Sequence, residues 1–406
     1  MFGYYSGQSN RMEVLFELHQ DRFYTDLIKS VEKPLRPLLY ARHIHSQFAL
    51  LAFFYEKDKV IMNFLKEYLA IESFDSVLFI IKEPPWNSKD GDARFWNARG
   101  SVQQLLSKLY DLSIAPMRME QDVRIDFRKR SKLEHLYLYI KDIKTLEELS
   151  EQYASPQEFF KALESTYISK LISEVRIRVK IRKKDDSLTF SELSEGEQQL
   201  LMVLGLLRFT KEDESLFLLD EPDTHLNPAW SVGYLKILRD VVGEQKTSQI
   251  IMTTHDPLMI SSLTRFEVII VRLDNLKNQF IAEHPEKDPI KMGYPEIITS
   301  ELFNLRSIVN PLILNLLDKK RVLASKEILN EDESQTLDSL NRQLDEFDFT
   351  NVIRDPLYDQ FVRAMTLIEN EMDLQKVALT KEQQDYRKKL AIDILRKIKN
   401  DTSREV

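Results

Sequence analysis

Residues 215–222 read Ser-Leu-Phe-Leu-Leu-Asp-Glu-Pro, an apolar run that ends in two acids and a proline. A continuous apolar run of this length is typical of a strand buried on both faces of a parallel sheet. Such sheets bind their ligands beyond the carboxyl ends of the strands. Asp220 and Glu221 are therefore expected to lie at a ligand site.

A second apolar run, residues 249–254, ends at His255. Between the two runs, a polar turn at residues 224–228 leads into a helix expected from Pro228 to Val242. A strand, a helix and a strand in this order build parallel sheets. A neutral imidazole at the end of the second strand can donate a hydrogen bond to a γ-phosphate, although a histidine at a strand end is also a common surface residue.

A third pattern lies upstream, where Leu-Ser-Glu-Gly-Glu-Gln-Gln at residues 193–199 opens an apolar helix. Ser194 is expected to cap this helix, and Glu197 completes a capping box three residues later. Gly196 leaves room for a phosphate to approach the backbone. The start of a helix attracts anions through its free amide groups, so this segment is a candidate phosphate contact, although capped helices are common.

The order and spacing of these three patterns resemble the ABC ATPase superfamily, and in particular its soluble SMC-like and restriction-associated or anti-phage members. By that resemblance residues 193–199 are the signature motif, 216–221 the Walker B strand, 225–227 the D-loop, and His255 the H-loop switch. Two departures from the transporter pattern are Glu195, where glycine is usual, and Asn227, where aspartate is frequent.

The resemblance implies an ATP hydrolase of α/β fold: a P-loop NTPase head of the ABC type, with a mostly parallel sheet. It implies ATP and Mg²⁺ as cofactors, with Asp220 holding Mg²⁺ through water and Glu221 polarising the attacking water. Glu221 and His255 are then the catalytic residues. The residues expected to contact the nucleotide are Ser194, Gly196, Glu197, Gln198 and Asn227.

The phosphate-binding loop of such a head is missing from the sequence. That loop needs a glycine followed by lysine and then serine or threonine, and none of the nine glycines is followed by lysine. The simplest explanation is a segment that precedes Met1. The alternatives are a partner polypeptide that completes a half-head, or a degenerate pseudo-ATPase that acts as a scaffold.

The organisation along the chain is expected to follow four segments: residues 1–83 as part of the ATPase head, 84–173 as a mainly helical insertion, 174–303 as the ABC-type core, and 304–406 as a helical C-terminal region. Few glycines and prolines predict a chain dominated by helices, with few and short strands. Strict alternation at residues 174–182 predicts a half-buried strand with one basic face. That face consists of Arg176, Arg178, Lys180 and Arg182.

Composition narrows the class of protein. The net charge of −8 argues against a surface that is basic throughout, and the absence of cysteine excludes disulfides and thiolate metal sites. No apolar stretch reaches the roughly 18 residues that a membrane span requires, and the start does not resemble a signal peptide, so a cytoplasmic location without membrane contact is expected.

Three functions compete at this stage. The first is a nucleotide switch, built as a head-to-tail homodimer, in a DNA-linked defence or repair system, where the basic face contacts DNA and a separate nuclease or toxin is the effector. No acidic nuclease cluster follows His255, which favours a separate effector. The second is the pseudo-ATPase scaffold. The third is a transporter's nucleotide-binding subunit, which the insertion and the charged tail disfavour.

Overall fold

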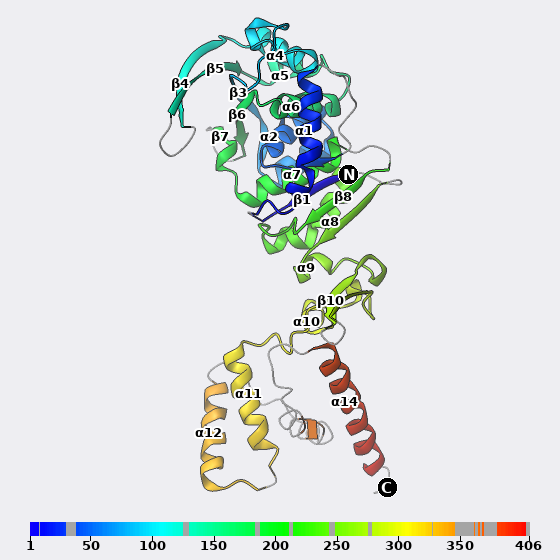
Figure 1. The fold of residues 1–406 in the computed structure, drawn as a ribbon. Coiled ribbons are helices and arrows are strands. Elements are labelled where there is room, and N and C mark those ends of the chain that lie inside the picture. Colours follow the sequence, from blue (N-terminus) through cyan, green and yellow to red (C-terminus); the bar gives the residue numbers. More distant parts are fainter. Residues whose placement is uncertain are drawn as a thin grey trace. The chain divides into compact units, whose positions relative to one another are not determined.

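The computed structural model describes residues 1–7, 9–29, 38–124, 130–182, 187–210, 214–242, 248–274, 278–326, 328–345, 361, 364, 365, 368 and 380–402. They form two compact units, Met1–Met259 and Ile260–Val406, each of which is described by itself. The first unit carries every motif of the sequence analysis, and Figure 1 shows its helices and strands.

The first unit contains a parallel sheet, which confirms the α/β fold class. Its strands lie in the order β2-β1-β8-β9 and are all parallel. Their bounds are β1, Phe2–Tyr5; β2, Leu39–Tyr40; β8, Leu216–Asp220; and β9, Gln249–Thr253. In this register Tyr5, Asp220 and Thr253 lie side by side at the carboxyl ends of three neighbouring strands. That edge of the sheet is where a ligand site is expected.

A second, antiparallel sheet lies in the same unit, and it includes the half-buried strand expected at residues 174–182. Its order is β4-β5-β3-β6-β7. The strands are β3, Ile71–Lys82; β4, Met117–Arg124; β5, Arg130–Ile140; β6, Ile172–Ile181; and β7, Ser187–Thr189. The prediction of few and short strands was wrong, because β3 has 12 residues, β5 has 11 and β6 has 10. The low content of glycine and proline, on which that prediction rested, does not distinguish long strands from helices.

The helices of the first unit pack around a core shared by the two sheets (Figure 1). They are α1, Val14–Ile28; α2, Ile44–Glu56; α3, Lys59–Tyr68; α4, Gly100–Leu112; α5, Ile143–Ser150; α6, Pro156–Ile168; α7, Glu195–Phe209; α8, Pro228–Val242; and α9, Pro257–Ile260. The helices α2 and α7 are apolar on nearly all sides, as expected of central buried helices. Gly205 of α7 faces Ala49 of α2, where an added Cβ would lie only 2.1 Å from the Ala49 Cβ. The two helices therefore approach closely at this glycine.

The insertion expected at residues 84–173 contains three α-helices, α4, α5 and α6, and also the β4–β5 hairpin. The strand expected at residues 174–182 is β6, with Val175, Ile177 and Val179 buried and the basic side chains exposed. It lies inside the sheet between β3 and β7 rather than at its edge.

The described residues of the second unit form helices and one hairpin. Its elements are β10, Ile270–Asp274; β11, Gln279–Glu283; α10, Tyr294–Thr299; α11, Pro311–Ala324; α12, Glu331–Asp345; and α14, Lys381–Thr402. Parts of residues 346–379 lie outside the description. This unit carries none of the candidate site residues.

Candidate nucleotide site at the ends of β8 and β9

Asp220, the last residue of β8, has both carboxylate oxygens engaged. The Thr253 hydroxyl, from the end of β9, donates to Oδ1 at 2.5 Å, and the Arg11 guanidinium donates to Oδ2 at 2.9 Å. The Arg11 side chain is 62% exposed and lies over the Tyr5 ring, 4.3 Å from its centroid. A cationic group thus already sits on the carboxylate that the sequence assigns to Mg²⁺.

Glu221 follows directly and lies beside His255. Its Oε1 is 3.3 Å from His255 Nδ1, and the two side chains are 39% and 74% exposed. The backbone of Glu221 is left-handed, with φ of 51°, a conformation that costs of order 1–3 kcal/mol in a residue other than glycine. Its amide donates to both the carbonyl and the hydroxyl of Thr253, which holds it there. The strained turn thus holds the glutamate beside the histidine, and both are exposed.

Further hydrogen bonds hold the turn that carries Glu221. Thr224 donates its hydroxyl to the Glu221 carbonyl at 2.9 Å and bonds Ser6 Oγ at 3.0 Å. Thr254 donates to Asp223 Oδ2 at 2.5 Å. Burial raises the pKa of the Asp223 carboxyl, and the hydrogen bond from Thr254 only partly offsets this. Side chains that follow β1, β8 and β9 thus hold this turn in place.

The signature segment forms the start of α7 as expected. Ser194 is the N-cap, its hydroxyl accepts from the Glu197 amide at 3.3 Å, and the Glu197 carboxylate accepts from the Ser194 amide at 2.7 Å. The predicted capping box is confirmed. A Cβ at Gly196 would lie 2.4 Å from the carbonyl oxygen of His225, a neighbour that the sequence analysis did not predict. The glycine lets the D-loop pack against the signature helix of the same chain.

The remaining two predicted contacts have partners within the chain. Gln198 is buried and donates from Nε2 to the Leu193 carbonyl at 2.7 Å. Asn227 accepts from the Trp230 amide at 3.0 Å, at the start of α8. Gln199 donates to the Glu221 carbonyl at 3.4 Å and so joins the signature helix to the end of β8. Contact of Gln198 and Asn227 with a nucleotide remains a prediction.

Arg11 and Thr253 are the site residues that the sequence reasoning missed. Thr253 was part of the second apolar run, and its register beside Asp220 follows only once β8 and β9 are paired. Arg11 is 209 residues from Asp220 in sequence. Its signal is the position of β1 next to β8, which places the residues after Tyr5 at the same sheet edge.

The residues present fit a magnesium nucleotide in part. Asp220 and Glu221 supply the carboxylate oxygens that Mg²⁺ prefers, and the arginine on Asp220 shows that the position attracts a cation. Across the part of the chain that is described, no group of three or more His, Asp or Glu side chains is arranged to hold a metal by itself.

One protein family matches part of this chain. Residues 85–261 match a family described as "AAA domain, putative AbiEii toxin, Type IV TA system". The match spans the signature segment, β8 and His255. The matched part of the chain, which is less than half of it, is thus similar to an AAA domain and contains the parallel strands β8 and β9, with the acids at the carboxyl end of β8.

Two curated proteins of the same name are similar to part of this chain. A Septu protein PtuA of Bacillus mycoides (strain KBAB4) is 25% identical over 200 residues, which cover 46% of this chain and 27% of that protein. A Septu protein PtuA of Bacillus thuringiensis is 26% identical over 102 residues, a quarter of each chain. The matched residues thus span about a quarter of the length of these relatives.

One solved structure, from work on the "ATP-driven dimerization and DNA stimulated activation of SMC ATPases", is 18% identical and covers 28% of this chain and 65% of the other. Its TM-score is 0.23, too low to support a shared fold. Separately, the described helices include none whose length and apolar character would let it span a bilayer.

Proposed function

We propose that this chain is a head of an ABC-type ATPase that binds and hydrolyses ATP. One observation carries the proposal: the ends of β8 and β9 bring Asp220, Glu221 and His255 into one cluster, with the last two exposed and 3.3 Å apart. An acid for the metal, an acid for the attacking water and a phosphate sensor are the parts that γ-phosphate hydrolysis requires.

The chemistry assigned to each side chain follows from its position. Mg²⁺ would neutralise phosphate charge when bound. Asp220 would help to hold it after Arg11 releases the carboxylate. Glu221 would orient and polarise the attacking water, and His255, in reach of the same carboxylate, would donate a hydrogen bond to the γ-phosphate. Thr253 keeps Asp220 in place throughout, because it bonds the other carboxylate oxygen.

The proposal requires a phosphate loop that is not among the 406 residues, in which no glycine precedes a lysine. The outer edge of β9 supports a place for it. Among the described residues β9 pairs only with β8, and Ile251 on this strand is 48% exposed. An unpaired edge presents free amide and carbonyl groups that readily accept another strand. We assign this edge to a strand that carries the phosphate loop, from a further segment of the same polypeptide or from a partner.

A head-to-tail homodimer completes the proposal. The start of α7 binds no phosphate of its own chain; it presents Ser194 and the first-turn amides to the nucleotide of the other head. Ser194 Oγ now donates to Glu197 at 2.8 Å, so a phosphate oxygen would take over that hydrogen bond. The nucleotide then acts as a reversible link between two heads, and hydrolysis separates them.

The process that the switch controls is proposed from likeness to the Septu proteins PtuA: a cytoplasmic defence system with a separate effector, such as a nuclease or toxin. The exposed basic face of β6 supports contact with DNA. Arg176, Arg178 and Arg182 have side chains that are more than half exposed. Such a face can neutralise backbone phosphates.

The test is a comparison of the wild-type protein with Glu221→Gln, both purified from the native locus together with any bound polypeptide. The proposal expects ATP hydrolysis by the wild type, and in the variant a loss of hydrolysis with an ATP-dependent dimer that persists in light scattering. Ser194→Ala should weaken dimer formation without blocking ATP binding. Normal hydrolysis by Glu221→Gln would refute the catalytic assignment.

The second candidate is a pseudo-ATPase scaffold, which the missing phosphate loop favours. It predicts that Glu221→Gln changes neither hydrolysis nor partner binding. The strained backbone of Glu221 and its contact with His255 disfavour it, because a scaffold has no use for a strained catalytic turn.

A further inference from the structure

The antiparallel sheet has one face packed against helices and one open face. Leu136, Leu138, Val175 and Ile177 point to the packed side and are buried. On the other side, Leu78 of β3 pairs with Tyr139 of β5 and with Arg176 of β6, so these three side chains form one row across the sheet. The residues that define the open face are Met117, Met119, Tyr137, Tyr139, Arg176, Arg178 and Lys180.

The open face is less polar than the solvated side of an antiparallel sheet usually is. Met117 is 55% exposed, Met119 49% and Tyr139 39%. Tyr137 lies between Met117 and Ile80 in the next row, and it accepts a hydrogen bond from Gln121. Exposed aromatic and methionine side chains that gather on one sheet surface mark a binding site rather than a bare solvent face.

The cations lie on the same face, along β6, which β3 separates from β5. Arg176 pairs with Glu174 through Nε and Nη2, which leaves Nη1 of its guanidinium for another acceptor. Arg178 donates to the Ser187 hydroxyl at 2.8 Å. Within the described residues no partner of the Lys180 ammonium group is found. Neighbouring strands are about 4.8 Å apart, so Tyr139 and Arg176, two strands apart, can contact adjacent parts of one ligand.

We propose that the open face binds single-stranded nucleic acid, with Tyr137 and Tyr139 as stacking platforms and Arg176, Arg178 and Lys180 as phosphate contacts. The bases of a single strand are free to stack on an aromatic ring, whereas those of a duplex are covered by their neighbours. The tyrosines lie along β5 and the cations along β6, with β3 between them, an arrangement that suits the bases and the phosphates of one single strand. This inference deepens the proposed nucleic-acid role of β6 and does not depend on ATP hydrolysis.

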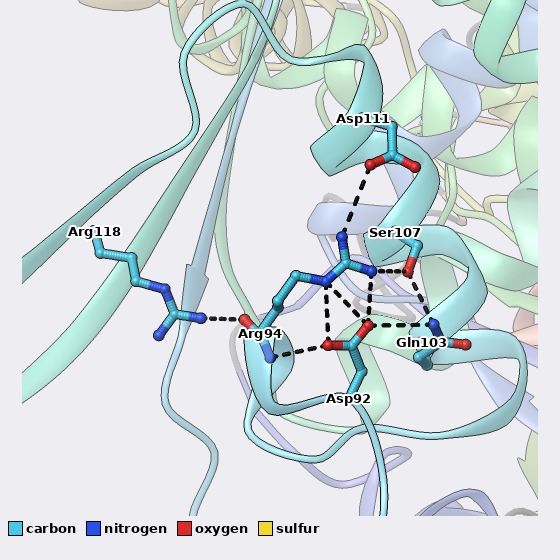
Figure 2. Close-up of polar contacts among 6 residues, drawn as sticks. All are labelled: Asp92, Arg94, Gln103, Ser107, Asp111 and Arg118. Carbon is cyan, nitrogen blue, oxygen red and sulfur yellow. Dashed lines mark hydrogen bonds and ion pairs between the residues drawn. The ribbon is translucent and has the colours of Figure 1, made fainter.

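The position of β4 is fixed by a network on the far side of the sheet (Figure 2). Arg118 lies between Met117 and Met119 in sequence and points to the opposite face, where it donates to the Arg94 carbonyl and pairs with Glu134 at 2.7 Å. Asp92 accepts from the amide and guanidinium of Arg94, and that hydrogen bond lowers the pKa of the Asp92 carboxyl. The network ties the strand to the loop before α4, so the methionines of the open face are held in place.

The experiment measures binding of fluorescent dT and U oligonucleotides and of a DNA duplex to the full chain by anisotropy, over a range of salt. Tyr139→Ala is expected to weaken single-strand binding about tenfold, within the range of stacking contributions. Lys180→Ala should lower the salt slope by about 0.7, the value for one phosphate of a single strand. The controls are Tyr386→Ala on α14, where the tyrosine is 45% exposed, and Lys236→Ala on α8.

The outcomes separate the stacking inference from the wider proposal. The stacking inference is supported if the protein prefers the oligonucleotides to the duplex and if Tyr139→Ala, but not Tyr386→Ala, weakens this binding. The comparison of dT with U oligonucleotides then shows whether DNA or RNA is preferred. Equal binding by Tyr139→Ala and the wild type, with tighter binding of the duplex that still needs Lys180, overturns the stacking role and leaves the nucleic-acid role of β6. Absence of any binding overturns both, while the ATPase proposal is judged separately by Glu221→Gln.

Discussion

Gly196 offers the sharpest test of how the signature helix is built. Replacement by alanine places a Cβ 2.4 Å from the His225 carbonyl oxygen, about 1 Å short of the ordinary contact distance of 3.4 Å. The obstacle is backbone, which cannot rotate away, so the D-loop must move. Overpacking of this kind costs roughly 1–3 kcal/mol. Since Gly196 lies in the first helical turn, the better helix propensity of alanine offsets little of that cost.

Gly233 of α8 is the matched control, because a Cβ there meets nothing closer than the Ile237 Cδ1 at 3.9 Å. Gly233→Ala should stabilise the fold by up to about 1 kcal/mol through helix propensity alone. The two variants should differ in stability by about 1–4 kcal/mol, so the melting temperature of Gly196→Ala should fall below that of Gly233→Ala by roughly 2–16 °C, at about 2–4 °C per kcal/mol. Thermal unfolding followed by circular dichroism measures this, and equal melting temperatures would refute the packing argument.

Three further predictions concern other contacts. Arg11→Ala should tighten Mn²⁺ binding at the end of β8 about 1.4- to fivefold in a paramagnetic titration, because an exposed ion pair contributes roughly 0.2–1 kcal/mol; unchanged affinity would exclude competition by this arginine. Asp223→Asn should raise the melting temperature more at pH 7 than at pH 4: burial raises the carboxyl's folded-state pKa, so ionisation at higher pH destabilises the fold, and a larger gain at pH 4 would contradict this. Gly205→Ala should destabilise by roughly 1–3 kcal/mol in urea unfolding, and Ala49→Gly should restore part of the loss if the close approach of the two helices is its cause.

Sequence reasoning found two of the four parallel strands, β8 and β9, and the helices α7 and α8, because each has a local signature. The apolar run before Asp220 locates β8. The capping box at Ser194 locates the start of α7. The helix expected from Pro228 to Val242 has those bounds in the structure. The sequence alone therefore locates polar residues that lie directly at the end of a strand or at the start of a helix.

The β4–β5 hairpin and the partners of the site could not be found in that way. The strands β4 and β5 carry charges on both sides, because part of each is exposed on both faces, so no simple alternation marks them. The bond from Arg11 to Asp220 depends on the pairing of β1 with β8 across more than 200 residues. The reason for Gly196 likewise depends on a tertiary neighbour, His225. In each case a contact distant in sequence determines the local structure.

The measurement that tests the central claim most directly is ATP hydrolysis by the protein purified from its own locus, compared with Glu221→Gln. The proposed ATPase predicts turnover in the wild type, with a loss of 100-fold or more in the variant, on the order of the effect of removing a group that acts only in the transition state. ATP binding should survive the substitution. Equal turnover in the two proteins, or no binding of ATP by either, would contradict the account.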